Sequence, residues 1–336
     1  MPAARTFSEL RLVNGSTGDP VLYLDYPGGD NALLFDAGDT GALDLKRLGD
    51  LEAVFLTHHH IDHFVGFDRI LRANIDRDKA LHVFGPAGTI RKVYDRIKSY
   101  EIQFFPFQKL ALVVHDLADG EIRRARLECS RRFPEPEVES RPWKGRVIYE
   151  NADLQVEAVA GDHTVPCFAY AMAEKTGFHP DPAKLAAGVL RPGPWVQEAL
   201  GLLRAGKPRQ TVLEIQGGRF ELGRLADQYF AESPGARVAY VTDTAWTEET
   251  RPRLTQLAKG AWRLYCDSYY ASAQLKQAAV HKHMTAAHAA ELAKAAKVDR
   301  LVLMHFGGRY AGRYEALVNE AKEIFPRACA EIGPAA

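Results

Sequence analysis

The residues best suited to chemistry lie in one short stretch, THHHIDHF, at positions 57–64. This stretch holds four of the chain's twelve histidines and one aspartate, and it directly follows the apolar run AVFL. Imidazole and carboxylate groups are ligands that zinc, iron and manganese accept in proteins. Buried groups of this kind need partners, so the pattern is hard to explain as packing and favours a metal site.

The spacing within the stretch indicates two metal ions rather than one. His58 and His60 occupy alternate positions, so their side chains point the same way if the segment stays extended. His59 then points the other way and is not expected to be a ligand. Asp62 and His63 lie on the following turn and reach a second point a few ångströms away.

Three further candidate ligands each follow a predicted strand: His163 in GDHTVPCFAY, Asp243 in VAYVTDT and His305 in LVLMHFGG. Taken alone, a histidine at a strand end is more often structural or surface-exposed, and an aspartate before threonine usually caps a turn or helix. A metal bound at residues 58–63 would make these three its natural completing ligands. A carboxylate at position 243 is then suited to bridge two cations.

Apolar runs predict the elements that must position these side chains. The segments expected as strands are 21–26, 32–38, 51–58, 80–86, 109–117, 153–163, 167–173, 237–244 and 300–308. The segments with helical spacing are 64–72, 88–102, 247–259, 285–297 and 311–325. The strands 21–26 and 32–38 flank turn residues and favour a hairpin, and the strand 51–58 is apolar on both faces and so central. This order favours an α/β fold with two packed sheets covered by helices, in one domain spanning residues 1–336.

Two segments break the pattern. Residues 120–148 are rich in arginine, proline and glutamate and are expected to form a surface insertion, either a solvated excursion or a contact for an anion. Residues 177–208 are punctuated by proline and glycine and are expected to form a protruding arm with short helical pieces.

Composition limits the class of protein. The chain has 336 residues, 46% hydrophobic and 26% charged, and its 43 basic residues balance its 43 acidic ones. This balance counts weakly against extensive phosphate binding and leaves room for a local basic patch. The four cysteines form no C-x-x-C pair, the N-terminus has no signal-peptide run, and no stretch approaches the roughly 20 apolar residues that span a bilayer. We therefore expect a cytoplasmic protein with no membrane partner.

The pattern H-x-H-x-D-H after an apolar strand, followed by a distant His, Asp and His at strand ends, resembles the metallo-β-lactamase fold superfamily. The resemblance implies a four-layer αββα sandwich with a dinuclear site at the sheet edges. It implies one metal held by His58, His60 and His163 and a second held by Asp62, His63 and His305, with Asp243 bridging.

The C-terminal segment HMTAAHAAELAKAAKVDRLVLMHFGGRY is similar to the ribonuclease Z family of tRNA 3′-processing endonucleases. That family has a His-x-Thr box and a strand ending in His-Phe-Ser-x-Arg-Tyr. The matching residues are His283, Thr285, His305, Phe306, Arg309 and Tyr310. GDHTVPCFAY resembles the family's Asp-His-Ser-x-Pro-x-x-Gly-Tyr segment, and LRPGPWVQEALGLLRAG resembles the base of its tRNA-binding arm.

The resemblance assigns further roles. It implies that His283 protonates the leaving oxygen and that Asp267 accepts a hydrogen bond from its imidazole, in a reaction in which Asp62 is also catalytic. Asp36 is a candidate partner for a ligating histidine, since such histidines usually need one. Arg309, Tyr310 and Lys207 are candidate RNA contacts. Taken alone, the residues around His283 favour a polar helix entry capped by Thr285.

Several positions depart from the family pattern. The family's Glu-Gly-Thr-Gln is absent from FDAGDTGAL, its His-Glu-Ala-Thr-Phe is CDSYY at 266–270, and Gly307 replaces the serine of the last box. Asp267 therefore stands where the family has glutamate. These changes spare the candidate ligands and touch the substrate surface.

Three functions are open at this point. The first is a zinc-dependent phosphodiesterase that removes tRNA 3′ trailers. The second is a hydrolase of a small cyclic phosphodiester, lactone or sulfate ester on the same fold. The third is a non-catalytic module that binds metal or RNA. The ligand types accept zinc, iron or manganese, and the resemblance implies a homodimer.

Overall fold

The computed structural model describes residues 7–26, 31–118, 120–233 and 235–331. These residues fall into two compact units. The first, which we call the sandwich unit, comprises residues 7–148, 156–171 and 238–331. The second, the arm unit, comprises residues 149–155 and 172–237. Within the described part of the chain, no helix is both long and apolar enough to cross a bilayer.

The first sheet has eight strands in sequence order among the described residues. They are β1 (Glu9–Leu12), β2 (Leu22–Asp25), β3 (Ala32–Phe35), β4 (Leu51–Phe55), β5 (Ala80–Pro86), β6 (Ala111–Ala118), β7 (Glu121–Glu128) and β8 (Val138–Pro142). Strands β3 to β6 are parallel neighbours, whereas β1–β2–β3 and β6–β7–β8 pair antiparallel. The carboxyl ends of β3 and β4 therefore meet at the same edge.

The second sheet has the order β19-β18-β17-β16-β11-β10-β9 over the ranges that the structure describes. Its strands are β9 (Val147–Glu150), β10 (Leu154–Ala160), β11 (Phe168–Glu174), β16 (Arg237–Val241), β17 (Arg263–Asp267), β18 (Arg300–Met304) and β19 (Ala328–Ala330). Strands β16 to β19 are parallel. Their carboxyl ends again share one edge.

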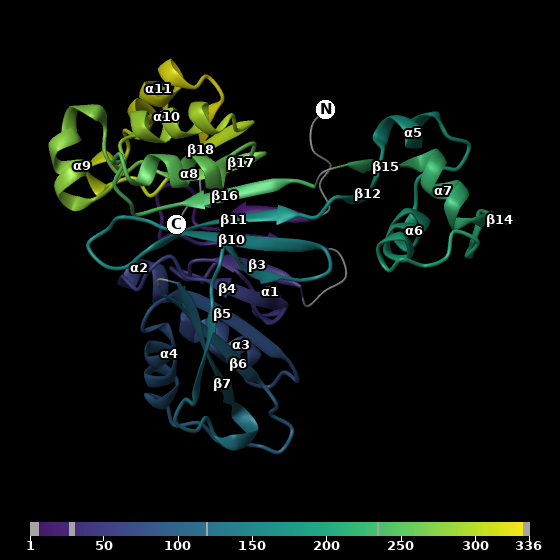
Figure 1. Cartoon of the computed structure of the whole chain (residues 1–336), viewed down its shortest axis with the longest axis horizontal. Coiled ribbons are helices and arrows are strands. Elements are labelled where there is room, and N and C mark those ends of the chain that lie inside the picture. The colour runs from purple at the N-terminus through teal and green to yellow at the C-terminus, as the bar shows by residue number, and fades with distance from the viewer. Residues whose placement is uncertain (1–6, 27–30, 119, 234, 332–336) are drawn as a thin grey trace. The chain divides into compact units, whose positions relative to one another are not determined.

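Helices cover the outer face of each sheet (Figure 1). The first sheet carries α1 (Leu45–Gly49), α3 (Phe67–Asn74) and α4 (Thr89–Lys98), and the second carries α8 (Thr250–Ala258), α10 (Ala286–Ala296) and α11 (Glu315–Ile324). Helix residues such as Phe67 and Leu292 are fully buried in these two apolar layers. Burying each such side chain contributes about 1.5–3 kcal/mol.

Aromatic rings fill the space between the two sheets of the sandwich unit. Phe35 of β3 stacks on Phe55 of β4, with ring centroids 5.1 Å apart. From the other sheet, Tyr170 and Tyr240 contact Phe35 at 6.1 and 5.9 Å. The Tyr170 hydroxyl also donates to the Leu56 carbonyl at 2.7 Å. These contacts fix the strand ends of one sheet against those of the other.

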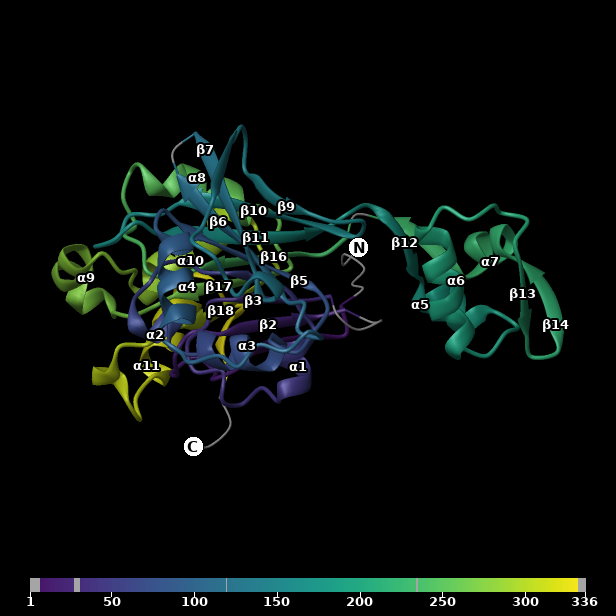
Figure 2. The ribbon, with the colours of Figure 1, turned by 90° about the horizontal axis from the view of Figure 1, so that it is seen from below.

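The arm unit has its own small core (Figure 2). Its elements are β12 (Gly177–Pro180), α5 (Pro182–Ala187), α6 (Pro194–Arg204), β13 (Val212–Ile215), β14 (Gly218–Glu221), α7 (Leu222–Tyr229) and β15 (Phe230–Ser233). Trp195 of α6 packs edge-on against Tyr229 of α7 at 5.1 Å. Leu213 and Leu225 are buried in the same cluster.

Most predicted elements are present, with ends within a few residues. Strands β2 and β3 pair antiparallel as the hairpin prediction requires, although turn residues 27–30 lie outside the described residues. Segment 120–148, expected as a surface insertion, contains β7, which pairs with β6 and buries Ile122 and Leu127. The compact unit that includes the predicted arm 177–208 extends to residue 237. Strand β17 was not predicted.

Candidate metal centre

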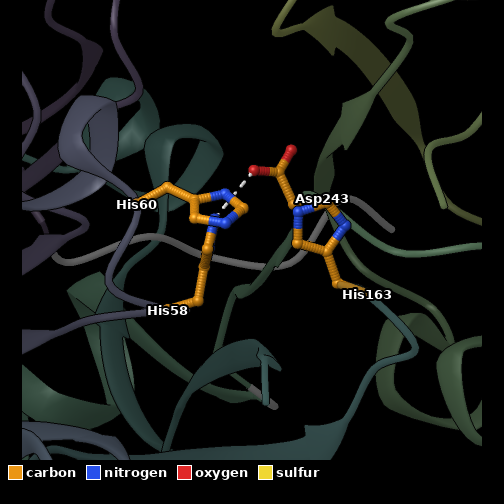
Figure 3. Close-up of side chains that lie close together, drawn as sticks. All are labelled: His58, His60, His163 and Asp243. Carbon is orange, nitrogen blue, oxygen red and sulfur yellow. Dashed lines mark ion pairs between the residues drawn. The ribbon is translucent and has the colours of Figure 1, made fainter. Parts of the chain in front are cut away.

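The seven candidate ligands come together in two groups within the sandwich unit. Ligand atoms of the first group all lie within 4.8 Å of one another, as do those of the second. The first group is His58, His60, His163 and Asp243; the second is Asp62, His63 and His305. In Figure 3 the four side chains of the first group come from three segments, with His58 and His60 on the same one, and lie around one shared space.

The ends of the parallel strands place these side chains. His58 follows β4, Asp243 follows β16 and His305 follows β18, while Asp62 and His63 lie on α2 (Ile61–Phe64). Asp243 and His305 have left-handed backbones, with φ of 49° and 57°. This conformation is costly for residues other than glycine and persists where the surrounding structure imposes it, often at functional sites. At both residues the backbone turns sharply at the edge of the sheet.

Asp243 joins the two groups. One oxygen, Oδ2, lies 3.2 Å from His58 Nε2 and 2.9 Å from His63 Nε2. The other, Oδ1, lies 3.0 Å from His305 Nδ1. The carboxylate is 1% exposed, and although burial acts to raise its pKa, the imidazoles of His305 and His63 hold that pKa well below its usual range. Asp243 is therefore ionised and faces both groups.

Asp36 orients His63 from behind. Its Oδ2 accepts a hydrogen bond from His63 Nδ1 at 2.8 Å and another from the Tyr240 hydroxyl at 3.0 Å. Its Oδ1 accepts from the backbone N–H and hydroxyl of Thr57 at 2.7 and 2.9 Å. With Nδ1 engaged, His63 presents Nε2 to the centre, which is the arrangement that metal-binding histidines normally show.

His163 is oriented in the same manner by a backbone carbonyl. Its Nδ1 lies 3.1 Å from the carbonyl oxygen of Lys282, which leaves Nε2 for the centre. The Lys282 side chain in turn pairs with Asp162 at 2.7 Å. Asp162, the neighbour of His163, therefore connects the loop that carries His163 to the segment that carries His283.

The chemistry of this donor set fits divalent metal ions. His58 Nε2, His63 Nε2 and His305 Nδ1 are buried, and apart from their close approach to the Asp243 carboxylate they have no hydrogen-bond partner among the described residues. Buried polar atoms without partners are costly, and cations between the two groups would satisfy all three. Burial, with the charge of His63, lowers the pKa of His58 to about 2. His58 is therefore neutral, as a metal ligand must be.

A histidine–aspartate pair lies beside the second group. His283 Nδ1 is 3.0 Å from Asp267 Oδ2 and 3.4 Å from Asp243 Oδ1. Burial acts to lower the pKa of His283, but the Asp267 carboxylate outweighs it and raises that pKa. Thr285 caps α10 by accepting from the His288 N–H at 3.1 Å. The cap interpretation of this segment is therefore confirmed, and it leaves the His283 side chain facing the cavity.

Members of both groups, together with His283, line one cavity of about 300 Å³. Its walls are His60, Asp62, His163, Thr164, Asp243, Tyr269, Val280, His281, His283 and His305. The cavity thus exposes metal-binding groups and a protonatable imidazole to the same small space.

Comparisons with known proteins agree with this geometry. The family model described as "Beta-lactamase superfamily domain" matches residues 31–178. A curated ribonuclease Z from Deinococcus radiodurans is 32% identical over 93% of this chain and 94% of its own. This chain belongs to the ribonuclease Z family. Another ribonuclease Z, from Myxococcus xanthus, is 27% identical over 94% of this chain and 92% of its own.

Solved structures show the same fold. The metallo-β-lactamase fold protein YhfI from Bacillus subtilis has a TM-score of 0.54 at 14% identity, covering 94% of this chain and 92% of its own. The short form of human tRNase Z has a TM-score of 0.50 at 17% identity, covering 91% and 93%. Family and fold make this chain a metal-dependent hydrolase.

The remaining candidates of this ribonuclease Z family member lie at different places. The Arg309 guanidinium lies 4.8 Å from the ring centroid of Tyr270. The Tyr310 hydroxyl accepts from the Ala271 N–H at 2.8 Å and donates to Gln274. Both residues are near the centre. Lys207 is exposed in the arm unit.

Three contributors to the site were not predicted from the sequence. The Tyr240 hydroxyl supports Asp36, and the Lys282 carbonyl supports His163. Tyr240 lies within an apolar strand and Lys282 acts through its backbone, so neither position carries a residue signal. Tyr269 lines the cavity, whereas the sequence suggested only general base stacking.

Proposed function

We propose that this ribonuclease Z family member is an endonuclease that removes 3′ trailers from tRNA precursors with the help of two divalent cations, zinc being the first candidate. One observation carries the proposal: Asp243 joins two ligand groups, and His283, held by the buried Asp267, lines the cavity that members of both groups also line. The curated ribonuclease Z relative, similar over 93% of the chain, supports it.

The residues sort into two candidate metal sites. His58, His60 and His163 would hold one cation, and Asp62, His63 and His305 the other, with Asp243 shared. Cations at such paired sites polarise a phosphoryl oxygen and lower the pKa of water, which supplies a nucleophile at neutral pH. Hydrogen bonding to His305 and the charge of His63 outweigh burial and lower the pKa of Asp62 to about 2. Asp62 is therefore an ionised carboxylate on the cavity wall, where it would help to hold a cation and would be available to accept a proton from water bound there.

His283 is the proposed proton donor. Asp267 engages Nδ1 at 3.0 Å, so the other ring nitrogen, Nε2, is left for the substrate. The raised pKa keeps a proton on the ring at higher pH than in an isolated histidine. A ribose oxygen that leaves phosphorus needs that proton, and general acid catalysis of this kind contributes about 10²- to 10⁴-fold.

RNA contacts are proposed from charge and shape. Arg309 and Tyr310 are near the cavity, where a guanidinium and an aromatic ring suit phosphate and base. Lys207 would contact phosphate from the arm unit, with an affinity that falls as salt rises. The homodimer remains a prediction, tested by the molar mass of the protein in solution.

The test uses two substrates. A tRNA with a 3′ trailer has a ribose oxygen as leaving group, whereas bis(p-nitrophenyl) phosphate releases a nitrophenolate that leaves without a proton. We expect His283→Ala to lower cleavage of the tRNA by about 10²- to 10⁴-fold. Metal content and hydrolysis of the aryl diester should stay close to wild type. Metal-loaded wild-type protein that leaves the tRNA intact but hydrolyses the aryl diester or a lactone would refute the proposal.

A further inference from the structure

The ring of Tyr269 covers one face of His283. The two rings are stacked, with centroids 4.4 Å apart and planes 24° from parallel. Tyr269 follows β17 by two residues, and its backbone N–H donates to Asp267 Oδ1 at 2.9 Å. The other oxygen of Asp267 engages His283 Nδ1. One carboxylate thus fixes both the imidazole and the residue that stacks on it.

Gly307 makes room for this ring. A Cβ atom at position 307 would lie 2.8 Å from Cε1 and 3.0 Å from Cδ1 of Tyr269. Real Cβ atoms do not approach carbon so closely, because interiors are packed at van der Waals distance. The Gly307 N–H also donates to the Tyr269 carbonyl at 3.3 Å. The loop after β18 therefore closes over Tyr269 only because residue 307 has no side chain.

Three departures from the family's motifs coincide at this point. In CDSYY and HFGGRY, Asp267 replaces glutamate, Tyr269 replaces threonine and Gly307 replaces serine. Asp267 and Tyr269 both contact His283, and Gly307 contacts Tyr269. Together they form a single arrangement, with a shorter carboxylate on one side and a larger ring on the other.

We propose that Tyr269 is a positioning residue that holds the imidazole of His283 in line for proton transfer, with Gly307 providing the space for its ring. The inference rests on the proposed role of His283 as proton donor. The hydrogen bond to Asp267 fixes Nδ1. The rings of His163 and His305 also lie near His283, at 5.1 and 5.6 Å, but the ring of Tyr269 is nearer, at 4.4 Å, and stacks on the face of the imidazole, so it limits rocking about that hydrogen bond most directly.

The aromatic ring of Tyr269, rather than its hydroxyl, positions His283. Within the described ranges the Tyr269 hydroxyl has no hydrogen bond, whereas the ring contacts His283 at 4.4 Å and His305 at 5.4 Å. Phenylalanine at position 269 should therefore position His283 as tyrosine does. Alanine at position 269 should not position His283, because no ring is then stacked on the imidazole. This difference separates positioning from chemistry at the hydroxyl.

The experiment compares Tyr269→Ala and Tyr269→Phe with wild type on the tRNA precursor and on bis(p-nitrophenyl) phosphate. We expect Tyr269→Ala to lower kcat on the tRNA about 10- to 100-fold, since a 1 Å misplacement has costs of that order. KM for the tRNA, the metal content and turnover of the aryl diester should change less than about threefold. Tyr269→Phe should restore tRNA cleavage. Phe107→Ala, which removes an exposed ring elsewhere, is the control.

Four outcomes overturn the inference. They are wild-type kcat in Tyr269→Ala, a rise in KM with unchanged kcat, an equal loss on both substrates, and failure of Tyr269→Phe to restore activity. Each shows that Tyr269 does not act through His283. They differ from failure of the proposed function, in which wild-type protein itself does not cleave the tRNA.

Substitution of Gly307 tests independently whether this glycine provides the space for the Tyr269 ring. Gly307→Ala should lower kcat on the tRNA in the wild-type background, because the new Cβ displaces the Tyr269 ring. The loss should be smaller in the Tyr269→Ala background, where the ring is gone and only the backbone contact at 2.8 Å remains. Residues in contact normally show such non-additivity. Strictly additive losses would overturn the link between the two residues.

Discussion

At the scale of single residues, Asp36 connects the candidate ligand His63 to Thr57 and Tyr240. It is fully buried and has a left-handed backbone, with φ of 58°. Its two oxygens engage Thr57, His63 and Tyr240, which come from both sheets. Because charge-assisted hydrogen bonds are stronger than neutral ones, this one carboxylate fixes the orientation of His63 against the sandwich.

The first prediction concerns Asp36→Asn. The amide nitrogen that replaces one oxygen cannot accept from His63 Nδ1 or from the Tyr240 hydroxyl, so at least one buried donor loses its partner. We expect metal affinity to fall about 10- to 100-fold, as it does when such supporting groups are removed. The unfolding free energy should fall by about 1–3 kcal/mol. Zinc titration against a competing chelator measures the first effect, and urea denaturation the second.

The matched control for this carboxylate is Asp78→Asn. Asp78 has a side chain that is 70% exposed and pairs with Lys109 at 3.1 Å, and exposed ion pairs contribute about 0–1 kcal/mol. The control should bind zinc as wild type does. Equal zinc affinity in Asp36→Asn and the control would show that His63 does not need Asp36.

At the scale of elements, the short helix α2 must pack tightly on the loop after β3. The Ala37 N–H donates to the His63 carbonyl at 2.9 Å, and the Gly66 N–H donates to the Ala37 carbonyl at 2.9 Å. A Cβ at Gly38 would lie 2.3 Å from the backbone oxygen of Asp62. Glycine at position 38 therefore allows the approach that sets Asp62 and His63 at the centre.

The second prediction concerns this close contact between the loop after β3 and α2. Gly38→Ala forces the loop and α2 apart, and overpacking of this kind costs about 1–3 kcal/mol. We expect one of two bound metals to be lost preferentially, because Asp62 and His63 belong to one group while His58 and His60 belong to the other. Metal content per chain should fall from two toward one. The measurement is elemental analysis after dialysis, with Gly201→Ala as control because nothing lies within 4 Å of its new Cβ.

An unchanged metal content in Gly38→Ala would contradict the role given to this contact. Loss of both metals together would contradict the assignment of Asp62 and His63 to a separate group. Gly201 lies in α6, where alanine is the better helix former by about 1 kcal/mol. The control should therefore be at least as stable as wild type.

Apolar runs were enough to predict most strands and so the strand-end positions of His58, Asp243 and His305. They were not enough for β17, which is short and begins with Arg263. Asp267 was found through its family motif alone. Its contact with His283, sixteen positions away, depends on the register in which Tyr270, after β17, pairs with Thr285 in a parallel bridge. Hydrophobic patterning carries no information on that register.

The segment 120–148 shows a second limit of pattern reasoning. Strand β7 alternates buried Ala125 and Leu127 with exposed Arg124 and Arg126, as a strand does when one face of its sheet is open to solvent. The adjacent exposed residues Arg123 and Arg124 interrupt the alternation. For that reason the sequence favoured a solvated surface insertion here. The stacking of Tyr269 on His283 could not be predicted from the sequence either, because it depends on the path of the loop that contains Gly307.

At the scale of the whole molecule, buried histidines outside the centre link stability to pH. His115 of β6 is 8% exposed and stacks on Phe84 of β5, with centroids 4.1 Å apart. Burial, with the charges of His82, Arg124 and Arg141, lowers its pKa to about 3. The His82 ring, 3.3 Å away between nitrogen atoms, also has a lowered pKa through burial. Both imidazoles are therefore neutral in the folded protein.

The last prediction is a loss of stability in mild acid that depends on His115. Its pKa is about 3 in the folded protein and 6.5 in the unfolded chain, so only the unfolded chain takes up the proton between these values. The stabilisation is complete above pH 6.5 and falls by up to about 1.4 kcal/mol per pH unit below it. His115→Phe keeps a ring against Phe84 and removes the proton uptake. Urea denaturation at pH 7, 6 and 5 should therefore show a smaller fall in unfolding free energy for the variant than for wild type, whereas parallel losses in the two proteins would mean that His115 is not the titrating group.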